Sequence, residues 1–233
     1  MNEKRIRATV AISGLTLMVL ALAEMITWNN PQLSDPASRV RDIFVADSTT
    51  SSVSIFLTAL TVIPILAFAA SLRVLAQRTS GIDSVWALLA SGAASVFAAA
   101  QITFAALSGA LVAGAPDATD HEIRLLLGAL TFLDAARFMP FAVMTAAAAL
   151  ATREAGVVPP WVVWVGVASG ALNFVSELSL LDWNGPLGNI GNAGQLGFLL
   201  FIVWTLAMAW SLLRRNSRQA SSRRLTRDAV ARS

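Results

Sequence analysis

The chain has 233 residues, of which 56% are hydrophobic and only 13% are charged, and its mean hydropathy is +0.65. Soluble domains typically carry about 25% charged residues, so this composition indicates lipid rather than water as the main solvent. The lack of cysteine excludes disulfides, iron–sulfur clusters and thiol catalysis. The single histidine, His121, lies outside the apolar runs, which excludes a bis-histidine haem site within the membrane.

Six apolar runs follow one another along the chain, each long enough to cross about 30 Å of hydrocarbon as a helix. In lipid, each segment must satisfy its own backbone polar groups, so these runs predict helices. We therefore expect an all-α, polytopic membrane protein, with a six-helix transmembrane bundle over residues 1–213. The spans are expected at about 8–27, 53–72, 85–113, 124–151, 161–181 and 193–213.

Lysine and arginine in the connecting segments predict the orientation of these spans. They gather before the first span, at the second and fourth connections and after the sixth span, which all fall on one side. Both termini are therefore expected in the cytoplasm, in a multi-pass protein of the inner (plasma) membrane. Residues 4–7, an apolar core and Ala21-Leu22-Ala23 also fit a cleaved signal peptide. The apolar run continues through Met25 and Ile26, which favours a first span that is retained.

The first outer connection contains Ser34-Asp35-Pro36, a combination typical of a helix start. Val40, Ile43 and Phe44 then share one helical face, so a short amphipathic helix is expected. This helix either lies on the outer membrane surface or caps the bundle, and the sequence leaves both alternatives open.

Thr119 and Glu122 have the spacing of a capping box at the start of the fourth span. Asp117, Asp120 and His121 lie beside them and could be mistaken for a metal site. One histidine without a second nitrogen or sulfur ligand is a weak metal signal. Capping explains these residues more economically, and we expect neither a metal nor a cofactor.

The stretch from Leu130 to Phe141 places Asp134 and Arg137 three residues apart inside an apolar run. Residues at this spacing share a helical face and can pair, and an unpaired charge in the membrane costs several kcal/mol. We therefore expect Arg137 to face the bundle interior and to contact Asp134 or an acid from another span. Pro140, close by, removes a helical hydrogen bond to the carbonyl of Ala136.

Other spans carry polar residues between the membrane centre and the outer surface. Asn173 and Glu177, four residues apart on the fifth span, share one face. We hypothesise one pocket, open to the outer face, whose acids share a proton or a cation because only one arginine balances them. The candidate ligand- or proton-binding residues are Glu24, Gln101, Asp134, Arg137, Asn173, Glu177, Asn192 and Gln195. The alternative is that these groups only hold the helices together.

Glycine recurs at every third position from 185 to 197, before and within the sixth span. The series lacks the Lys-Ser/Thr ending of a phosphate-binding P-loop and follows no predicted strand, so nucleotide binding is not expected. Small residues let membrane helices approach closely, and we interpret the series as a packing surface.

The last twenty residues, 214–233, are rich in arginine and serine and poor in apolar residues. They predict a disordered cytoplasmic tail that is attracted to anionic lipid headgroups. The expected partners are thus the lipid bilayer, these headgroups and further copies of the chain, with no nucleic acid.

Three segments carry a resemblance to a known group of proteins: residues 35–44 (DPASRVRDIF), 64–75 (PILAFAASLRVL) and 157–166 (VVPPWVVWVG). In these segments and in its layout the chain resembles small six-helix bacterial membrane proteins that are defined by a domain of unknown function. The resemblance implies the fold and a bacterial origin, and it implies no activity.

Three classes of function remain open. The expected one is a packing or accessory membrane component without catalysis of its own. The alternative is binding or transport of a small ligand or proton through the outer-half pocket. An enzyme that acts on lipid is the third class, but the chain contains neither H-E-x-x-H nor G-x-S-x-G.

Overall fold

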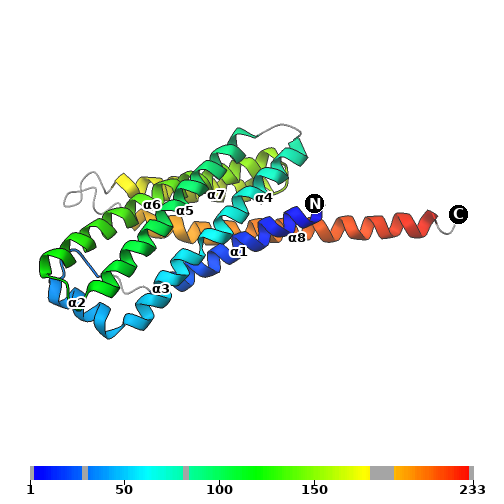
Figure 1. The fold of residues 1–233 in the computed structure, drawn as a ribbon. Coiled ribbons are helices and arrows are strands. Elements are labelled where there is room, and N and C mark those ends of the chain that lie inside the picture. Colours follow the sequence, from blue (N-terminus) through cyan, green and yellow to red (C-terminus); the bar gives the residue numbers. More distant parts are fainter. Residues whose placement is uncertain (1–2, 28–30, 81–83, 179–191, 231–233) are drawn as a thin grey trace.

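The computed structural model describes residues 3–27, 31–80, 84–178 and 192–230, with all their side chains except those of Ser80, Asn192 and residues 215–230. These residues form helices and contain no strand, so the predicted all-α fold is confirmed for this part of the chain (Figure 1). The helices are α1 (Glu3–Thr27), α2 (Ala37–Ala46), α3 (Ser48–Leu60), α4 (Val62–Ser80), α5 (Val85–Gly114), α6 (Asp120–Glu154), α7 (Pro160–Ser176) and α8 (Asn192–Val230).

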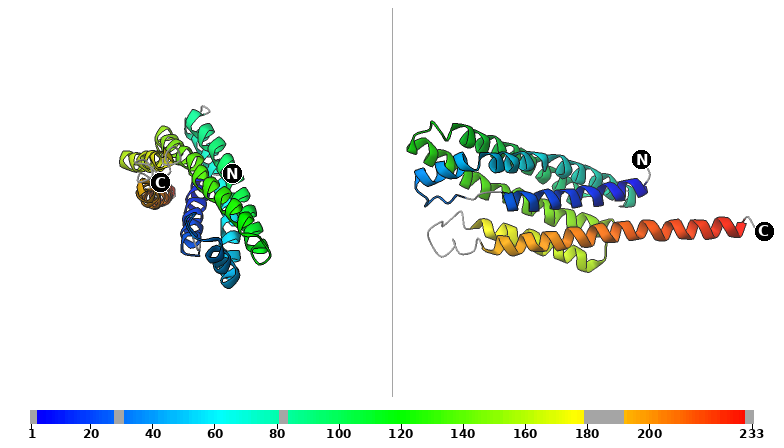
Figure 2. Two further views of the ribbon diagram at one scale, coloured as in Figure 1. Left: turned by 90° about the vertical axis from the view of Figure 1, so that its left-hand side faces the viewer. Right: turned by 90° about the horizontal axis from the view of Figure 1, so that it is seen from below.

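The long helices lie along one bundle and alternate in direction. They contact one another in a closed ring, in the order α1, α4, α5, α6, α7, α8 and back to α1. Figure 2 shows α7 and α8 together along one side of the bundle. The start of α1 and the end of α8 lie at one end of the bundle, whereas α2 and the α5–α6 turn lie at the other. We call these the basic end and the capped end.

Within the part of the chain that the structure describes, five helical segments are long and apolar enough to cross a membrane. They are α1, the α3–α4 segment, α5, α6 and the part of α8 from Ala193 to Arg214. The fifth predicted span, at 161–181, overlaps α7, which is apolar but has only 17 residues. Its last residues, 179–181, lie outside the described part of the chain.

The second predicted span is divided into two helices. α3 ends at Leu60, and α4 begins at Val62. Pro64 accounts for the break, because it has no N–H to donate to the carbonyl of Leu60 and its ring crowds that carbonyl. The residue between the two helices, Thr61, is fully buried, and its hydroxyl donates a hydrogen bond to the Thr58 carbonyl at 2.6 Å.

The short helix α2 caps the bundle, which decides between the two alternatives left open by the sequence. Val40 and Phe44 are buried against a cluster that includes Phe104 of α5 and Ile123 of α6. Arg41 also joins α2 to the connection between α5 and α6, since its Nη2 donates to the carbonyl of Ala118 at 2.8 Å. The apolar face of α2 therefore packs against the rest of the bundle.

The predicted capping box at the start of α6 is confirmed. The Thr119 hydroxyl accepts a hydrogen bond from the backbone N–H of Glu122, and the Glu122 side chain accepts one from the backbone N–H of Thr119. Two backbone donors at the helix N-terminus are thereby satisfied.

Two glycines of α7 permit close packing with its neighbours. A Cβ atom at Gly170 would lie 2.7 Å from the carbonyl oxygen of Ala142 on α6, and one at Gly166 would lie 2.5 Å from Trp204 Nε1 on α8. Of the predicted glycine series, Gly194 and Gly197 face α7, and the first three members lie outside the described residues.

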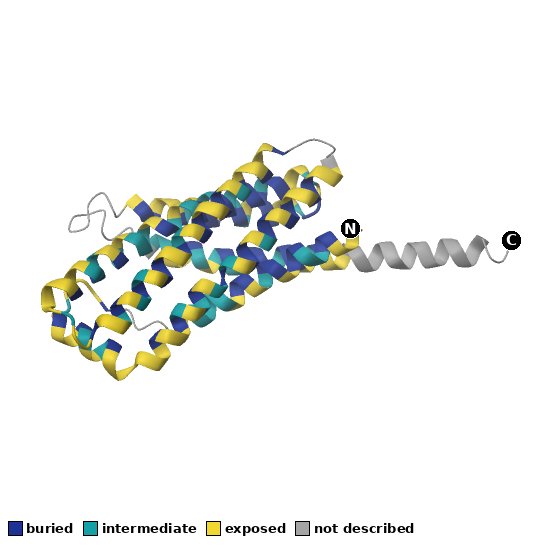
Figure 3. Cartoon of the chain, viewed as in Figure 1, coloured by how far each residue is buried: buried dark blue, intermediate teal, exposed yellow. Residues whose placement is uncertain are grey.

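The bundle contains two apolar clusters, with buried residues on the inward faces of the helices (Figure 3). The larger cluster fills the basic end and includes Phe97 of α5 and Phe141 of α6. The smaller one fills the capped end beneath α2 and includes Phe104 and Leu130 of the same two helices. Residues between these pairs on α5 and α6 thus lie at the boundary of the two clusters.

The C-terminal segment differs from the prediction of a disordered tail from residue 214, because α8 continues to Val230. Arginine, leucine, alanine and glutamine are all strong helix formers, and this composition lets the helix extend past its apolar part.

Candidate functional site

Arg137 lies at the boundary of the two apolar clusters and is only 8% exposed. Its Nη2 atom is 2.6 Å from Oδ1 of Asp134, one helical turn away, and 3.3 Å from Oε1 of Glu24 on α1. The interior position and the acid partners are those expected from the spacing in the sequence. The ion pair thus connects α6 to α1.

Gln101 extends this network to two further helical segments. Nη1 of Arg137 donates a hydrogen bond to Oε1 of Gln101 on α5. The Gln101 amide nitrogen in turn donates to the hydroxyl of Thr61 at 3.2 Å, at the break between α3 and α4. One continuous chain of polar contacts therefore joins α1, α6, α5 and the α3–α4 junction.

Two aromatic rings enclose the Arg137 guanidinium. Its Cζ atom is 4.1 Å from the centroid of the Phe104 ring and 5.5 Å from that of Phe138. These cation–π contacts stabilise a desolvated guanidinium. Phe104 belongs to the cluster at the capped end, and Phe138 packs against the cluster at the basic end. The two rings therefore lie between the guanidinium and the two apolar clusters.

Asn173 on α7 is buried, but its amide group is used within the α7–α8 pair. Its Nδ2 donates to the carbonyl of Ser169 at 2.8 Å, and the Ser169 hydroxyl donates to the carbonyl of Gly197 on α8 at 2.7 Å. Asn173 therefore contributes to helix packing through one of the two N–H donors of its amide.

Glu177 directly follows the last residue of α7 and is only 7% exposed. Oε1 receives a long hydrogen bond of 3.4 Å from the Ser176 hydroxyl, and Oε2 has no partner among the described residues. Buried polar atoms normally have partners, so the unpaired oxygen marks this position as unusual.

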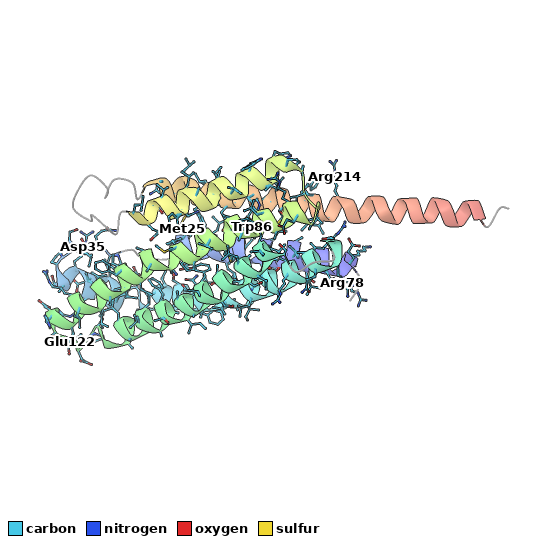
Figure 4. The ribbon with its side chains drawn as sticks, turned by 90° about the horizontal axis from the view of Figure 1, so that it is seen from above. Met25, Asp35, Arg78, Trp86, Glu122 and Arg214 are labelled. Atoms are coloured by element: carbon cyan, nitrogen blue, oxygen red, sulfur yellow. The ribbon has the colours of Figure 1, made fainter. Side chains whose placement is uncertain are left out.

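Arg137 and Glu177 lie at a similar distance from the basic end. Sixteen residues separate Arg137 from Arg153 on α6, and sixteen separate Glu177 from Trp161 on α7. At 1.5 Å per residue, each separation corresponds to about 24 Å. Figure 4 shows Arg78, Trp86 and Arg214 towards one end, Asp35 and Glu122 at the other, and Met25, the neighbour of Glu24, between them.

Tryptophan and arginine mark the basic end. The Arg153 Cζ lies 5.8 Å from the ring centroid of Trp164, and the Arg214 Cζ lies 5.1 Å from that of Trp210. Four exposed tryptophans lie towards this end, and they are Trp86, Trp161, Trp164 and Trp210. Exposed tryptophans next to arginine are typical of a membrane–water interface.

The structure brings some of the candidate residues together and separates others. Glu24, Gln101, Asp134 and Arg137 are joined by direct contacts. Among the described residues, the side chain of Glu177 has a hydrogen bond only with Ser176. On α8, Gln195 is exposed, and the side chain of Asn192 lies outside the described part of the chain.

Two residues of the site were not anticipated from the sequence. Thr61 and Phe104 both contact the network, but each lies in a run that the sequence presents as ordinary membrane helix. Thr61 could have been identified from its position three residues before Pro64. A proline can break a helix, and the backbone groups left without hydrogen bonds attract polar side chains such as the Thr61 hydroxyl. No signal in the sequence distinguishes Phe104 from its apolar neighbours.

Within the described residues, no group of three or more His, Cys, Asp or Glu side chains could hold a metal ion. Comparisons with protein-family models, with curated proteins and with solved structures found no match for this chain. The residues of the site are therefore the basis for a functional proposal.

Proposed function

We propose that this chain crosses the bacterial inner membrane six times and has both termini in the cytoplasm. In this proposal α7 is a membrane span in addition to the five longer segments. Two features support this. α7 lies in the same ring as the five longer segments and follows their alternation in direction. Arginine and exposed tryptophan gather at the end where α1 begins, and positively charged residues favour the cytoplasmic side.

Its role, in this proposal, is that of a packing or accessory membrane component without catalysis of its own. This proposal is supported by the contacts of Arg137, because both of its terminal nitrogens are already bound, by Glu24, Gln101 and Asp134. A buried arginine engaged in this way fixes the positions of several helices. It is a poor candidate for a group that binds and releases a substrate.

The experiment compares two ways of removing the charge. Arg137→Leu leaves two carboxylates without their cation, and loss of one partner of a buried ion pair costs about 3 to 5 kcal/mol. The neutral set Glu24→Gln/Asp134→Asn/Arg137→Gln leaves none stranded, so it should unfold at a higher temperature than Arg137→Leu in detergent.

The control is Arg39→Leu, which removes an arginine from an exposed ion pair with Asp35 at the capped end. Exposed pairs contribute about 0 to 1 kcal/mol, so this variant should behave like the wild-type protein. Equal melting temperatures for Arg137→Leu, Arg39→Leu and the wild type would contradict the structural role of Arg137.

A second candidate function is the binding of a small ligand or proton in the outer half of the membrane. Glu177 favours it, because one of its buried carboxyl oxygens has no partner among the described residues. A carboxyl group placed in this way is more costly than a packing role requires, since leucine or glutamine would fill the same space.

We also propose that the basic part of α8 contacts anionic lipid headgroups at the cytoplasmic surface. The helix continues from its apolar part directly into the arginine-rich segment, up to Val230. Basic segments next to a membrane span are attracted by the negative potential of the inner leaflet.

A further inference from the structure

Arg7, near the start of α1, is buried like Arg137 but has fewer partners. Its side chain is only 7% exposed, and its Nη2 pairs with the carboxylate of Glu3, one helical turn away. Nε and Nη1 are buried and have no partner among the described residues, so three of the five N–H donors of the guanidinium lack an acceptor there. Unpaired donors of a buried charged group are costly. The surroundings of Arg7 therefore call for an anion.

Arg7 faces the groove between α4 and α8. Two helical turns further along α1, a Cβ atom at Gly14 would lie 3.5 Å from Thr205 of α8 and 3.6 Å from Phe68 of α4. Arg7 precedes Gly14 by seven residues, so both lie on the same face of α1. α4 and α8 run in the opposite direction to α1, and seven residues beyond Phe68 and Thr205 they carry two fully buried side chains, Leu75 and Leu212.

The other charges around this groove are mostly positive. Within one helical turn of the same level, α4 carries Arg78 and α8 carries Arg214. The first turn of α1 adds Lys4 and Arg5. The N-terminus of a helix also has a partial positive charge and backbone N–H groups that favour an anion. The arginine, the helix terminus and the neighbouring basic residues thus favour the same kind of ligand.

Glu3 indicates where such an anion binds. Its carboxylate contacts Arg7 from the first turn of α1, and its side chain is 42% exposed. The contact between the two side chains therefore lies where the buried guanidinium meets the exposed start of the helix. An ion pair with one exposed partner contributes little stability, so the Glu3 side chain is easily exchanged for another anion.

We propose that Arg7 binds a phosphate group at the basic end, in the place that the Glu3 carboxylate holds in this structure. Phosphate oxygens accept two parallel hydrogen bonds from one guanidinium, whereas Glu3 contacts only Nη2. Basic pockets between membrane helices on the cytoplasmic side bind the headgroups of anionic lipids. The site lies on α1, and it is separate from the lipid contact proposed above for the basic part of α8.

Two sources can supply the phosphate group. One is the headgroup of an anionic inner-leaflet phospholipid, such as phosphatidylglycerol, and the other is free phosphate in the cytoplasm. Both present the same oxygen atoms to Arg7. They differ in whether acyl chains hold the ligand beside α1.

The test measures the melting temperature of the full-length protein in a neutral maltoside detergent. One arm adds phosphatidylglycerol or phosphatidylcholine, whose headgroup carries its own ammonium group beside the phosphate. The other arm compares sodium phosphate with sodium chloride at equal ionic strength. We expect phosphatidylglycerol to raise the melting temperature more than phosphatidylcholine does. A larger effect of sodium phosphate than of sodium chloride would show that the acyl chains are not required.

Two variants of the site should change the response in opposite directions. Arg7→Gln removes the charged donor and should weaken the apparent affinity for phosphatidylglycerol about tenfold or more. Glu3→Gln removes the competing carboxylate and should strengthen that affinity. Arg73→Gln is the matched control, because it removes an exposed arginine of α4 near the same end and should respond like the wild type. If Arg7→Gln does not fold, the comparison of Glu3→Gln with the wild type decides.

Each outcome supports or overturns the proposal. A response to phosphatidylglycerol alone identifies the lipid as the source, and a response to sodium phosphate identifies the phosphate group itself as sufficient. Equal responses of Arg7→Gln and Arg73→Gln, or a Glu3→Gln response no stronger than that of the wild type, overturn it. Any response that remains in Arg7→Gln reports the contact of α8 with headgroups. Because the measurements require neither a membrane orientation nor the role of Arg137, their failure leaves those proposals intact.

Discussion

At the scale of single residues, the cost of burying Arg137 explains most of its surroundings. A guanidinium away from water needs partners for its donors, and three helices supply oxygen atoms to its two terminal nitrogens. Its Nε has no partner among the described residues. Aromatic rings fill the remaining faces of the group. The sequence therefore predicts that Arg137 is buried and paired, but pairing partners on distant helices depend on the packing of the whole bundle.

Gly170 brings the backbone of α7 close to the backbone of α6. A Cβ atom there would lie 2.7 Å from the backbone oxygen of Ala142, which a side-chain rotation cannot relieve. We predict that Gly170→Ala separates the two helices and destabilises the protein by about 1 to 3 kcal/mol. The measurement is the midpoint of thermal or denaturant unfolding in detergent.

Gly128→Ala is the matched control for this prediction. Nothing lies within 4 Å of a Cβ atom at Gly128, which is inside α6. Alanine in a helix interior is favoured over glycine by about 0.5 to 1 kcal/mol, so this variant should be slightly more stable than the wild type. A loss of stability in both variants would mean that helix packing at Gly170 is not the cause.

At the scale of elements, helix ends were more predictable than helix interruptions. The capping box of α6 follows from two residues at a fixed spacing, since its hydrogen bonds are local. The separation of α3 from α4 was not predicted, because Pro64 in an apolar run is compatible with either a kink or a break. Packing of Thr61 against Gln101 accompanies the break in the structure.

The capping box makes the stability of the start of α6 dependent on pH. Glu122 precedes the predicted span, and hydrogen bonds from the backbone N–H and then the hydroxyl of Thr119 lower the pKa of its carboxyl from the ordinary value of 4.5. A lowered folded-state pKa stabilises the folded protein above the ordinary value. That contribution is lost as the pH falls through the folded-state pKa.

We therefore predict that Glu122→Gln melts at a lower temperature than the wild type at neutral pH, and that the difference shrinks below about pH 4.5. Melting curves of the two proteins between pH 7 and pH 3 provide the measurement. Asp117→Asn, which removes a neighbouring acid outside the capping box, should show no comparable pH-dependent difference. A difference that stays constant down to pH 3 would exclude the capping carboxylate as its source.

At the scale of the whole molecule, composition and hydropathy predict the helical bundle. Both indicate a lipid solvent, and in lipid each segment must satisfy its own backbone polar groups. The candidate site was only partly predictable. Residues that share a helix, such as Asp134 and Arg137, have a relation fixed by helical geometry. Asn173 has the same kind of relation to Glu177, but its Nδ2 donor bonds to the carbonyl of Ser169 in its own helix, an alternative that spacing cannot exclude.

The alternation of the six segments leads to the last prediction, which concerns orientation. Residue 117 is exposed at the capped end, and residue 221 lies on α8 beyond its apolar part, towards the opposite end. The chain has no cysteine, so Asp117→Cys and Ser221→Cys each provide a single reactive thiol. A membrane-impermeant maleimide should label Asp117→Cys in intact cells and should label Ser221→Cys only after the membrane is permeabilised.

The pair of variants also tests the span count, since each additional crossing moves residue 221 to the other side. If α7 does not cross the membrane, five crossings place the two residues on the same side, and both thiols react in intact cells. Labelling of Ser221→Cys alone would reverse the orientation and place the arginine-rich end outside, against the attraction of basic residues to the cytoplasmic side. Protection of Ser221→Cys together with labelling of Asp117→Cys requires an odd number of crossings between the two residues. With α6 and α8 both crossing, this means that α7 also spans the bilayer.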